Sequence, residues 1–184
     1  MIWLITGGSG SGKSEYAEKL ACRLADEETR RKKNPVQKLY LATMLDDGSE
    51  ARERITRHRS LREGKGFITV EAPYGMKSKE TYDIVLLECV SNLAANLMFG
   101  KQMKVEEMAA EILKQVKRLS ETCPHVIVVS NEVFSDGVLY DRETMEYVQG
   151  IGLVNRRLAQ LAEHVCDVVY SIPVYMKGED PCIS

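Results

Sequence analysis

Residues 2–14 read Ile2-Trp3-Leu4-Ile5-Thr6-Gly7-Gly8-Ser9-Gly10-Ser11-Gly12-Lys13-Ser14 and contain the most informative pattern of the chain. Positions 7–14 match G-x-x-x-x-G-K-[ST], which is typical of a loop that binds the phosphates of a nucleoside triphosphate. A short apolar strand leads into the loop, and apolar residues at helical spacing follow it. A flexible turn rich in glycine and serine is the alternative, and both the strand and the Lys-Ser ending argue against it.

The glycines, Lys13 and Ser14 of this loop have expected roles in binding phosphate. Glycines let backbone N–H groups turn toward phosphate oxygens where a Cβ would clash, and the following helix directs its positive dipole end there. Lys13 would neutralise the β and γ phosphates and act in catalysis, and Ser14 would ligate Mg²⁺. The residues expected to bind nucleotide here are Gly7, Gly8, Ser9, Gly10, Ser11, Gly12, Lys13 and Ser14.

Strand-like and helical segments alternate along the rest of the chain. This alternation predicts an α/β fold of the P-loop NTPase type, with a mostly parallel sheet and helices on both faces. We interpret residues 27–33 as a loop, residues 145–165 as a long helix, and Gly150 and Gly152 as interruptions of that helix. The sequence contains no repeat or linker, so we expect residues 1–184 to form a single nucleotide-binding kinase or nucleotidyltransferase domain.

Composition narrows the class of protein and its partners. The chain has 184 residues, 44% of them hydrophobic and 28% charged, which is typical of a globular domain. The net charge of −2 gives no indication of a nucleic-acid partner. The 5 cysteines form no C-x-x-C pair, so neither a zinc site nor a disulfide framework is indicated. Their odd number, without a signal peptide, favours the reducing cytoplasm. No apolar run approaches the roughly 20 residues that a membrane span needs.

Glu88 follows the apolar run Ile84-Val85-Leu86-Leu87 directly. In phosphate-loop enzymes an acidic residue at the end of a neighbouring strand holds Mg²⁺ directly or through water, so we expect Glu88 to be a second metal ligand. The alternative is that this carboxylate stabilises the N-terminus of the following helix.

His58 is the one histidine among three that lies between arginines, in the segment 52–62. In one interpretation this segment is a solvated basic helix face. In the other, the guanidinium groups gather phosphate oxygens and the imidazole attacks phosphorus, forming a covalent phosphoramidate. We expect a structural role for His125 and a surface position, late in a helix, for His164.

Ser130 and Asn131 follow another buried strand, residues 126–129. Ligands of parallel sheets bind beyond the carboxyl ends of the strands, so these two residues are candidate substrate contacts. They could equally cap the N-terminus of a helix. The basic run at residues 30–33 is best explained by a solvated loop.

Several segments together resemble the bifunctional adenosylcobinamide kinase/adenosylcobinamide-phosphate guanylyltransferase family of cobalamin biosynthesis. The similarity runs through nearly the whole chain. Beyond the phosphate loop, the segments that carry it are Tyr40-Leu41-Ala42-Thr43, His58-Arg59, Thr69-Val70-Glu71, Leu86-Leu87-Glu88-Cys89 and Ser130-Asn131-Glu132-Val133.

The resemblance implies two reactions. A nucleoside triphosphate, ATP or GTP, phosphorylates adenosylcobinamide, and GTP then transfers GMP to adenosylcobinamide phosphate through a guanylyl-histidine at the position of His58. The resemblance also implies a homotrimer. Further residues that it implies as contacts of the guanine nucleotide are Leu41, Ala42, Thr43, Arg59, Ser60, Leu61, Arg62, Glu71 and Glu88.

Two other functions remain open from the sequence. A simple small-molecule kinase would use the phosphate loop without a covalent step, and His58 would then take no part in the reaction. A nucleotide-binding switch module would bind nucleotide without turning over an acceptor.

Overall fold

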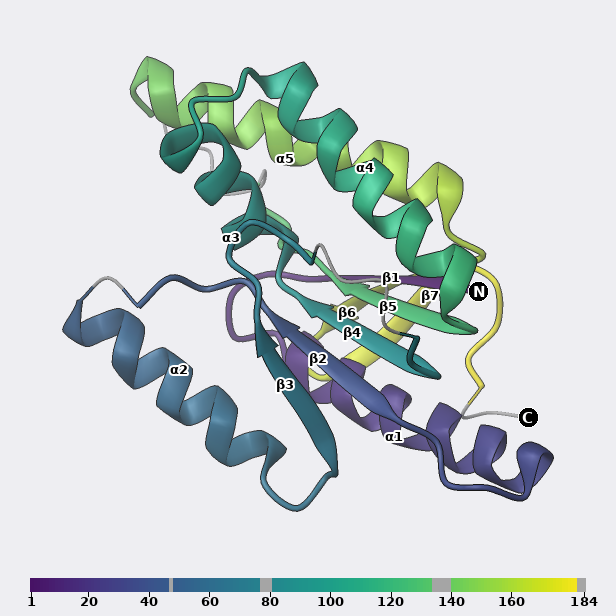
Figure 1. Ribbon diagram of the computed structural model, residues 1–184. Helices are drawn as coiled ribbons and strands as arrows, with labels where there is room; N and C mark the ends of the chain where they lie inside the picture. The colour runs from purple at the N-terminus through teal and green to yellow at the C-terminus, as the bar shows by residue number, and fades with distance from the viewer. Residues whose placement is uncertain (47, 77–80, 134–139, 182–184) are drawn as a thin grey trace.

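A seven-stranded sheet forms the centre of the computed structural model (Figure 1), which describes residues 1–46, 48–76, 81–133 and 140–181. Within the described helix at residues 49–62, the side chains of Glu50, Arg54 and Leu61 are not described. The strands are β1 (Ile2–Thr6), β2 (Lys38–Ala42), β3 (Phe67–Glu71), β4 (Ile84–Glu88), β5 (His125–Val129), β6 (His164–Val169) and β7 (Ile172–Lys177).

The strands lie in the order β3-β2-β4-β5-β1-β6-β7. All neighbours are parallel except β6 and β7, which pair antiparallel. The mostly parallel α/β sheet predicted from the sequence is therefore confirmed. Because the carboxyl ends of parallel strands meet at one edge, the segments that follow β1, β2, β4 and β5 come together there.

Helices cover both faces of the sheet (Figure 1). The helix α1 (Lys13–Lys32) packs on one face, where residues such as Trp3, Ile5 and Tyr40 are buried. The other face carries α3 (Val90–Ala95), the π-helix η1 (Asn96–Gly100), α4 (Val105–Thr122) and α5 (Arg142–Leu161). The remaining helix, α2 (Ser49–Arg62), lies beyond the β3 edge of the sheet.

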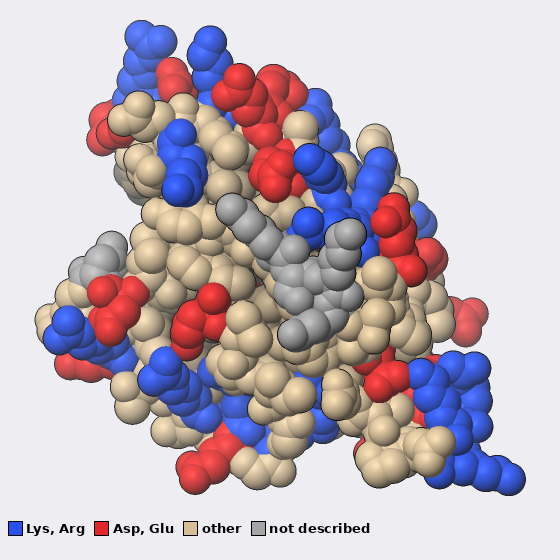
Figure 2. Space-filling view, viewed as in Figure 1, with Lys and Arg blue, Asp and Glu red and all other residues tan. Residues whose placement is uncertain are grey.

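Charged side chains of both signs are interspersed over the face shown in Figure 2. Basic side chains gather at one corner, where α1 ends with Arg30, Arg31 and Lys32. No helix of the described ranges is long and apolar enough to cross a membrane.

The loop predicted at residues 27–33 is wrong, because α1 continues to Lys32. Glu28 holds this last turn: its carboxylate accepts from Arg31 Nη2 at 2.6 Å and lies 3.8 Å from Lys32 Nζ. Such pairs three and four residues apart stabilise a helix. Lys33, with φ of 57°, then ends the helix in the left-handed conformation.

The interruption predicted at Gly150 and Gly152 is also wrong, since α5 runs without a break from Arg142 to Leu161. At Gly150 a Cβ would lie only 2.9 Å from Met108 Cε of α4. This glycine therefore allows two helices to approach closely, which is a packing role that sequence alone does not distinguish from a break.

The helix predicted to reach residue 165 ends at Leu161, and His164 belongs to β6 instead. The prediction of a surface, helical His164 is wrong: its ring stacks on Trp3 of β1 with the ring centroids 3.6 Å apart. His125 is buried in β5, with Nε2 3.4 Å from Glu28 Oε1, and burial lowers its pKa.

Candidate nucleotide site

The predicted phosphate loop connects β1 to α1 and is braced by the turn between β6 and β7. Ser171 N, in that turn, donates to Ser11 O at 2.8 Å, and Ser11 N donates to Gly8 O at 3.2 Å. Gly12 has φ of 91°, and a Cβ at this position would lie 2.5 Å from Ser171 Oγ. Glycine is therefore required at residue 12 for conformation and for space.

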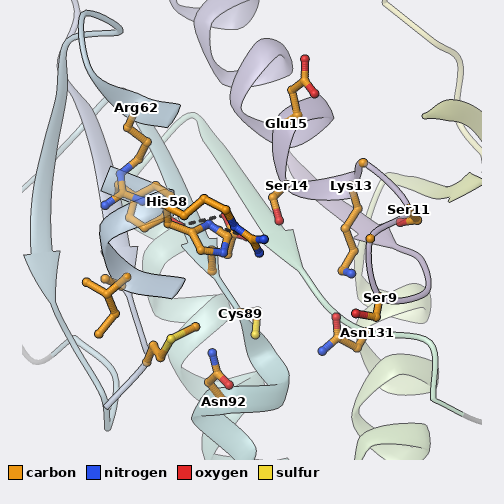
Figure 3. A pocket seen from close by; sticks show the side chains of 18 of the residues that line it. Ser9, Ser11, Lys13, Ser14, Glu15, His58, Arg62, Cys89, Asn92 and Asn131 are labelled. Atoms are coloured by element: carbon orange, nitrogen blue, oxygen red, sulfur yellow. Dashed lines mark hydrogen bonds and ion pairs between the residues drawn. The ribbon is translucent and has the colours of Figure 1, made fainter. Parts of the chain in front are cut away.

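Lys13 bends back over the loop. Its Nζ donates to Gly8 O at 2.9 Å, and the side chain lines the cavity above the loop (Figure 3). An ammonium group at this place lies beside the backbone amides that would surround phosphates, so it can neutralise the charge of phosphate oxygens bound there.

The loop forms one wall of a cavity with a volume of about 320 Å³. Figure 3 shows Lys13 and Ser14 on one side of it and His58 and Arg62 on the other. The residues predicted from the loop motif and the family resemblance that line the cavity are Ser9, Gly10, Ser11, Gly12, Lys13, Ser14, Ala42, His58, Arg62, Glu71 and Glu88.

Other predicted residues do not line this cavity. Leu41 is fully buried in the core, and Thr43 Oγ1 donates to Cys89 O at 2.8 Å and accepts from Cys89 N at 2.7 Å. Thr43 thus joins the ends of β2 and β4. The predicted nucleotide contacts outside the cavity lining are Gly7, Gly8, Leu41, Thr43, Arg59 and Ser60, and the side chain of Leu61 lies outside the described part of the chain.

Arg59 and Ser60 line a separate groove between α2 and β3. Arg59 Nη2 lies 2.9 Å from Glu71 Oε1, and both side chains are about half exposed or more, at 62% and 48%. Since Glu71 also lines the main cavity, this ion pair stands at the boundary between the two depressions.

His58 faces the interior of the molecule, because its side chain is only 18% exposed. Its Nδ1 lies 3.8 Å from Glu88 Oε1, and the Nδ1 atom itself is buried with no hydrogen-bond partner among the described residues. The other ring nitrogen, Nε2, is therefore the one through which His58 can react with a molecule in the cavity.

Tyr40 holds the second oxygen of the same carboxylate, at 2.9 Å from its hydroxyl to Glu88 Oε2. Burial, and after it the charge of Glu88, raises the pKa of the Tyr40 hydroxyl, so the group remains protonated and donates. The Arg62 guanidinium stacks on the Tyr40 ring, 3.6 Å from its centroid. The sequence alone does not single out Tyr40 as a functional residue, since a tyrosine in a strand usually indicates core packing.

Asn131 lines the cavity, and Ser130 supports the segment that carries it. Ser130 Oγ donates to Asn155 Oδ1 at 2.6 Å, and Asn155 Nδ2 donates to Asn131 O at 3.1 Å. Among the described residues, no helix begins at 130–133; Asp141 caps α5, accepting from Thr144 N at 2.7 Å. The alternative of a helix cap at Ser130 or Asn131 is therefore excluded within the described part of this segment.

The cavity offers donors that suit Mg²⁺. The ion prefers oxygen ligands and is usually bound by one or two protein groups together with water and substrate phosphates. The Ser14 hydroxyl and the Glu88 carboxylate line the same cavity as the phosphate loop, so the residues fit this ion. Among the residues described, no group of three or more His, Cys, Asp or Glu side chains forms a separate metal site.

Comparison with known proteins shows what the chain is similar to. Residues 3–176 match the family model described as cobinamide kinase / cobinamide phosphate guanyltransferase. The "Bifunctional adenosylcobalamin biosynthesis protein CobU" of Salmonella typhimurium is 32% identical, over 96% of this chain and 100% of that protein. The protein of the same name from Escherichia coli is 33% identical over the same shares. Among solved structures, KaiC-like protein PH0186 from Pyrococcus horikoshii OT3 has a TM-score of 0.48 and 13% identity, over 90% of this chain and 71% of that one.

Proposed function

The chain belongs to the cobinamide kinase / cobinamide phosphate guanyltransferase family, and we propose from this premise how one cavity serves both of its reactions. As a member of the family the chain is a cobinamide kinase and cobinamide phosphate guanylyltransferase of adenosylcobalamin biosynthesis.

In the kinase reaction, the phosphate loop and Lys13 hold the nucleoside triphosphate, ATP or GTP, and offset its charge. Ser14 and Glu88 would hold Mg²⁺, which when bound neutralises charge on the phosphate oxygens. The hydroxyl of adenosylcobinamide attacks the γ-phosphorus, the bond to the bridging oxygen breaks, the nucleoside diphosphate leaves, and the proton of the hydroxyl passes to water. Asn131 supports the acceptor from the carboxyl end of β5.

In guanylyl transfer, His58 acts as the nucleophile. The lone pair of Nε2 attacks the α-phosphorus of GTP, an N–P bond forms, and the P–O bond to pyrophosphate breaks. The positive charge that develops on the ring faces the Glu88 carboxylate. An oxygen of adenosylcobinamide phosphate then attacks the same phosphorus, and the electrons of the N–P bond return to Nε2.

One observation carries this proposal: His58 and the phosphate loop line the same cavity, although 44 positions separate His58 from Ser14 in the sequence. A simple kinase would have no use for an imidazole there. A switch module is disfavoured by the same geometry, because a largely buried nucleophile beside a phosphate site is an arrangement for group transfer. We also infer a cytoplasmic homotrimer, on the family resemblance alone.

Covalent labelling tests the proposal. The protein, His58→Ala and the control His164→Phe are incubated with Mg²⁺ and GTP labelled at the α-phosphate, and retained label is counted after denaturation. The control removes an imidazole outside the cavity and keeps an aromatic ring against Trp3. We expect acid-labile, alkali-stable label on the wild type and the control only. Label on His58→Ala, or no label on folded wild type that binds GTP, would overturn the proposal.

A further inference from the structure

Tyr40 connects the two groups that surround the proposed nucleophile. Its hydroxyl donates to Glu88 Oε2 at 2.9 Å, and its ring lies 3.6 Å from the Arg62 guanidinium. The ring also meets Phe67 edge-on, with the centroids 6.1 Å apart and the planes at 79°. Tyr40 is 2% exposed, so these contacts hold it in one orientation.

The hydroxyl of Tyr40 selects which oxygen of Glu88 meets His58. Because Oε2 accepts from Tyr40, the carboxylate is turned so that Oε1 lies 3.8 Å from Nδ1 of His58. A carboxylate only accepts hydrogen bonds, so the ring nitrogen that it faces is favoured as the one that carries the proton. Catalytic contacts of this kind are often long before substrate binds and shorten in the reacting complex.

The ring of Tyr40 acts on His58 through the helix. His58 and Arg62 are four residues apart in α2 and therefore lie on one face of it. Arg62 is 7% exposed, and within the described residues its Nε and Nη1 are buried without a hydrogen-bond partner. Stacking on Tyr40 therefore helps, beside the ion pair of Arg59 and Glu71, to fix the rotation of this end of α2, and with it the direction of His58.

We propose that Tyr40 is a positioning residue for guanylyl transfer, which orients the Glu88 carboxylate and docks Arg62 so that His58 keeps its proton on Nδ1 and presents the lone pair of Nε2 to GTP. This inference rests on the proposed role of His58. When Nε2 attacks the α-phosphorus and pyrophosphate leaves, the proton stays on Nδ1, and the cationic ring faces Glu88. The departure of GMP to the acceptor restores the neutral ring with the same proton.

If Glu88 served only to bind the metal ion, the position of the proton on the His58 ring would not depend on Tyr40. Measuring which ring nitrogen carries this proton therefore tests the role of Tyr40. Nitrogen-15 NMR of the histidine rings at alkaline pH reports which ring nitrogen carries the proton. The chain has 3 histidines, and comparison with His58→Ala assigns the signal of His58. We expect the Nδ1–H form in the wild type and a shift toward the Nε2–H form in Tyr40→Phe, which lacks only the hydroxyl.

Rates of guanylyl-enzyme formation provide the second readout. In Tyr40→Phe we expect kcat to fall by about 10- to 100-fold, the range for losing a hydrogen bond to a charged group, with little change in KM for GTP. The matched control is Tyr147→Phe, which removes a tyrosine hydroxyl that donates to Ser91 O at 3.1 Å outside the cavity lining. The control should form guanylyl-enzyme at the wild-type rate.

The outcomes separate this inference from the function on which it rests. Label on His58→Ala would show that His58 is not the nucleophile, and both proposals would then be wrong. A label that depends on His58, together with an unchanged rate and an unchanged NMR signal in Tyr40→Phe, would overturn the role of Tyr40 alone. A wild-type His58 that carries its proton on Nε2 would overturn it without any variant.

Discussion

The two sides of the cavity are built in different ways. The phosphate loop is held by backbone hydrogen bonds, from Ser171 N to Ser11 O at 2.8 Å and from Glu132 N to Gly7 O at 3.0 Å. The opposite side belongs to α2, where Arg62 is the one buried residue among the side chains described. Charged side chains connect this helix to the rest of the protein, as in the ion pair of Arg59 and Glu71.

This difference separates what the two reactions share from what distinguishes them. Both reactions need triphosphate held in place, and the backbone loop supplies that regardless of which phosphorus is attacked. Only guanylyl transfer needs the nucleophile, and it stands on the helix that side chains position. Substitutions in the loop should therefore affect both reactions, whereas substitutions around α2 should affect guanylyl transfer more.

The largest effect is expected from Lys13→Ala. Loss of the ammonium group that offsets phosphate charge should lower kcat/KM of both reactions by about 100- to 1000-fold. Assays of cobinamide phosphorylation and of GMP transfer measure this. The control is Lys19→Ala, further along α1, whose side chain is 68% exposed and pairs with Glu15. A loss confined to one reaction would contradict the division between loop and helix.

Gly12→Ala should act on the loop through the backbone. A residue with a Cβ is strained at φ of 91°, and the new methyl group would lie 2.5 Å from Ser171 Oγ. We expect a loss of about 2–3 kcal/mol in the free energy of unfolding, measured by urea denaturation. Gly8→Ala is the matched control, since a Cβ there meets nothing within 4 Å. Equal stability of the two variants would show that the loop is not braced by this turn.

The sequence predicts the loop side better than the helix side. The glycines, Lys13 and Ser14 act through a local pattern, and the alternation of strands and helices already places them at a sheet edge. The contacts of Tyr40 with Glu88 and Arg62 join β2, β4 and α2, so no local spacing reveals them.

The antiparallel strand β7 is not predicted by the local sequence pattern either, for a related reason. Its residues Ile172, Val174 and Met176 alternate with partly buried Pro173 and Tyr175, and the strand forms only because β6 offers it an edge. Whether such a segment forms a strand depends on its pairing with a neighbouring strand, because its local propensity is ambiguous. Ser171 meets the phosphate loop because the turn between β6 and β7 lies at this edge of the sheet, and the composition of the segment does not reveal this contact.

Lys65→Met tests the contact that holds the C-terminal end of α2 against α1. Lys65, just beyond the helix, lies 2.6 Å from Glu18 Oε2 of α1, and the Glu18 side chain is 1% exposed. Removing the cation leaves a buried carboxylate unpaired, at a cost of about 2 kcal/mol in the free energy of unfolding, since Lys65 itself is partly exposed. Lys65→Arg, which keeps the charge, is the control in the same urea titration. Guanylyl transfer should fall more than phosphorylation, and an equal fall in both would contradict the special dependence on α2.

The smallest effect is expected from Arg59→Ala. The pair with Glu71 is exposed, at 62% and 48%, so water and salt weaken it and its loss should change the free energy of unfolding by about 0.2–1 kcal/mol. A double-mutant cycle with Glu71→Gln isolates the pair, and its coupling energy should decrease as salt is raised. The coupling energy could instead be as large as the loss of unfolding free energy in Lys65→Met and independent of salt. This part of α2 would then be held as firmly as the end near Glu18. The contrast between a backbone-built and a side-chain-built wall would then apply only to the segment around His58.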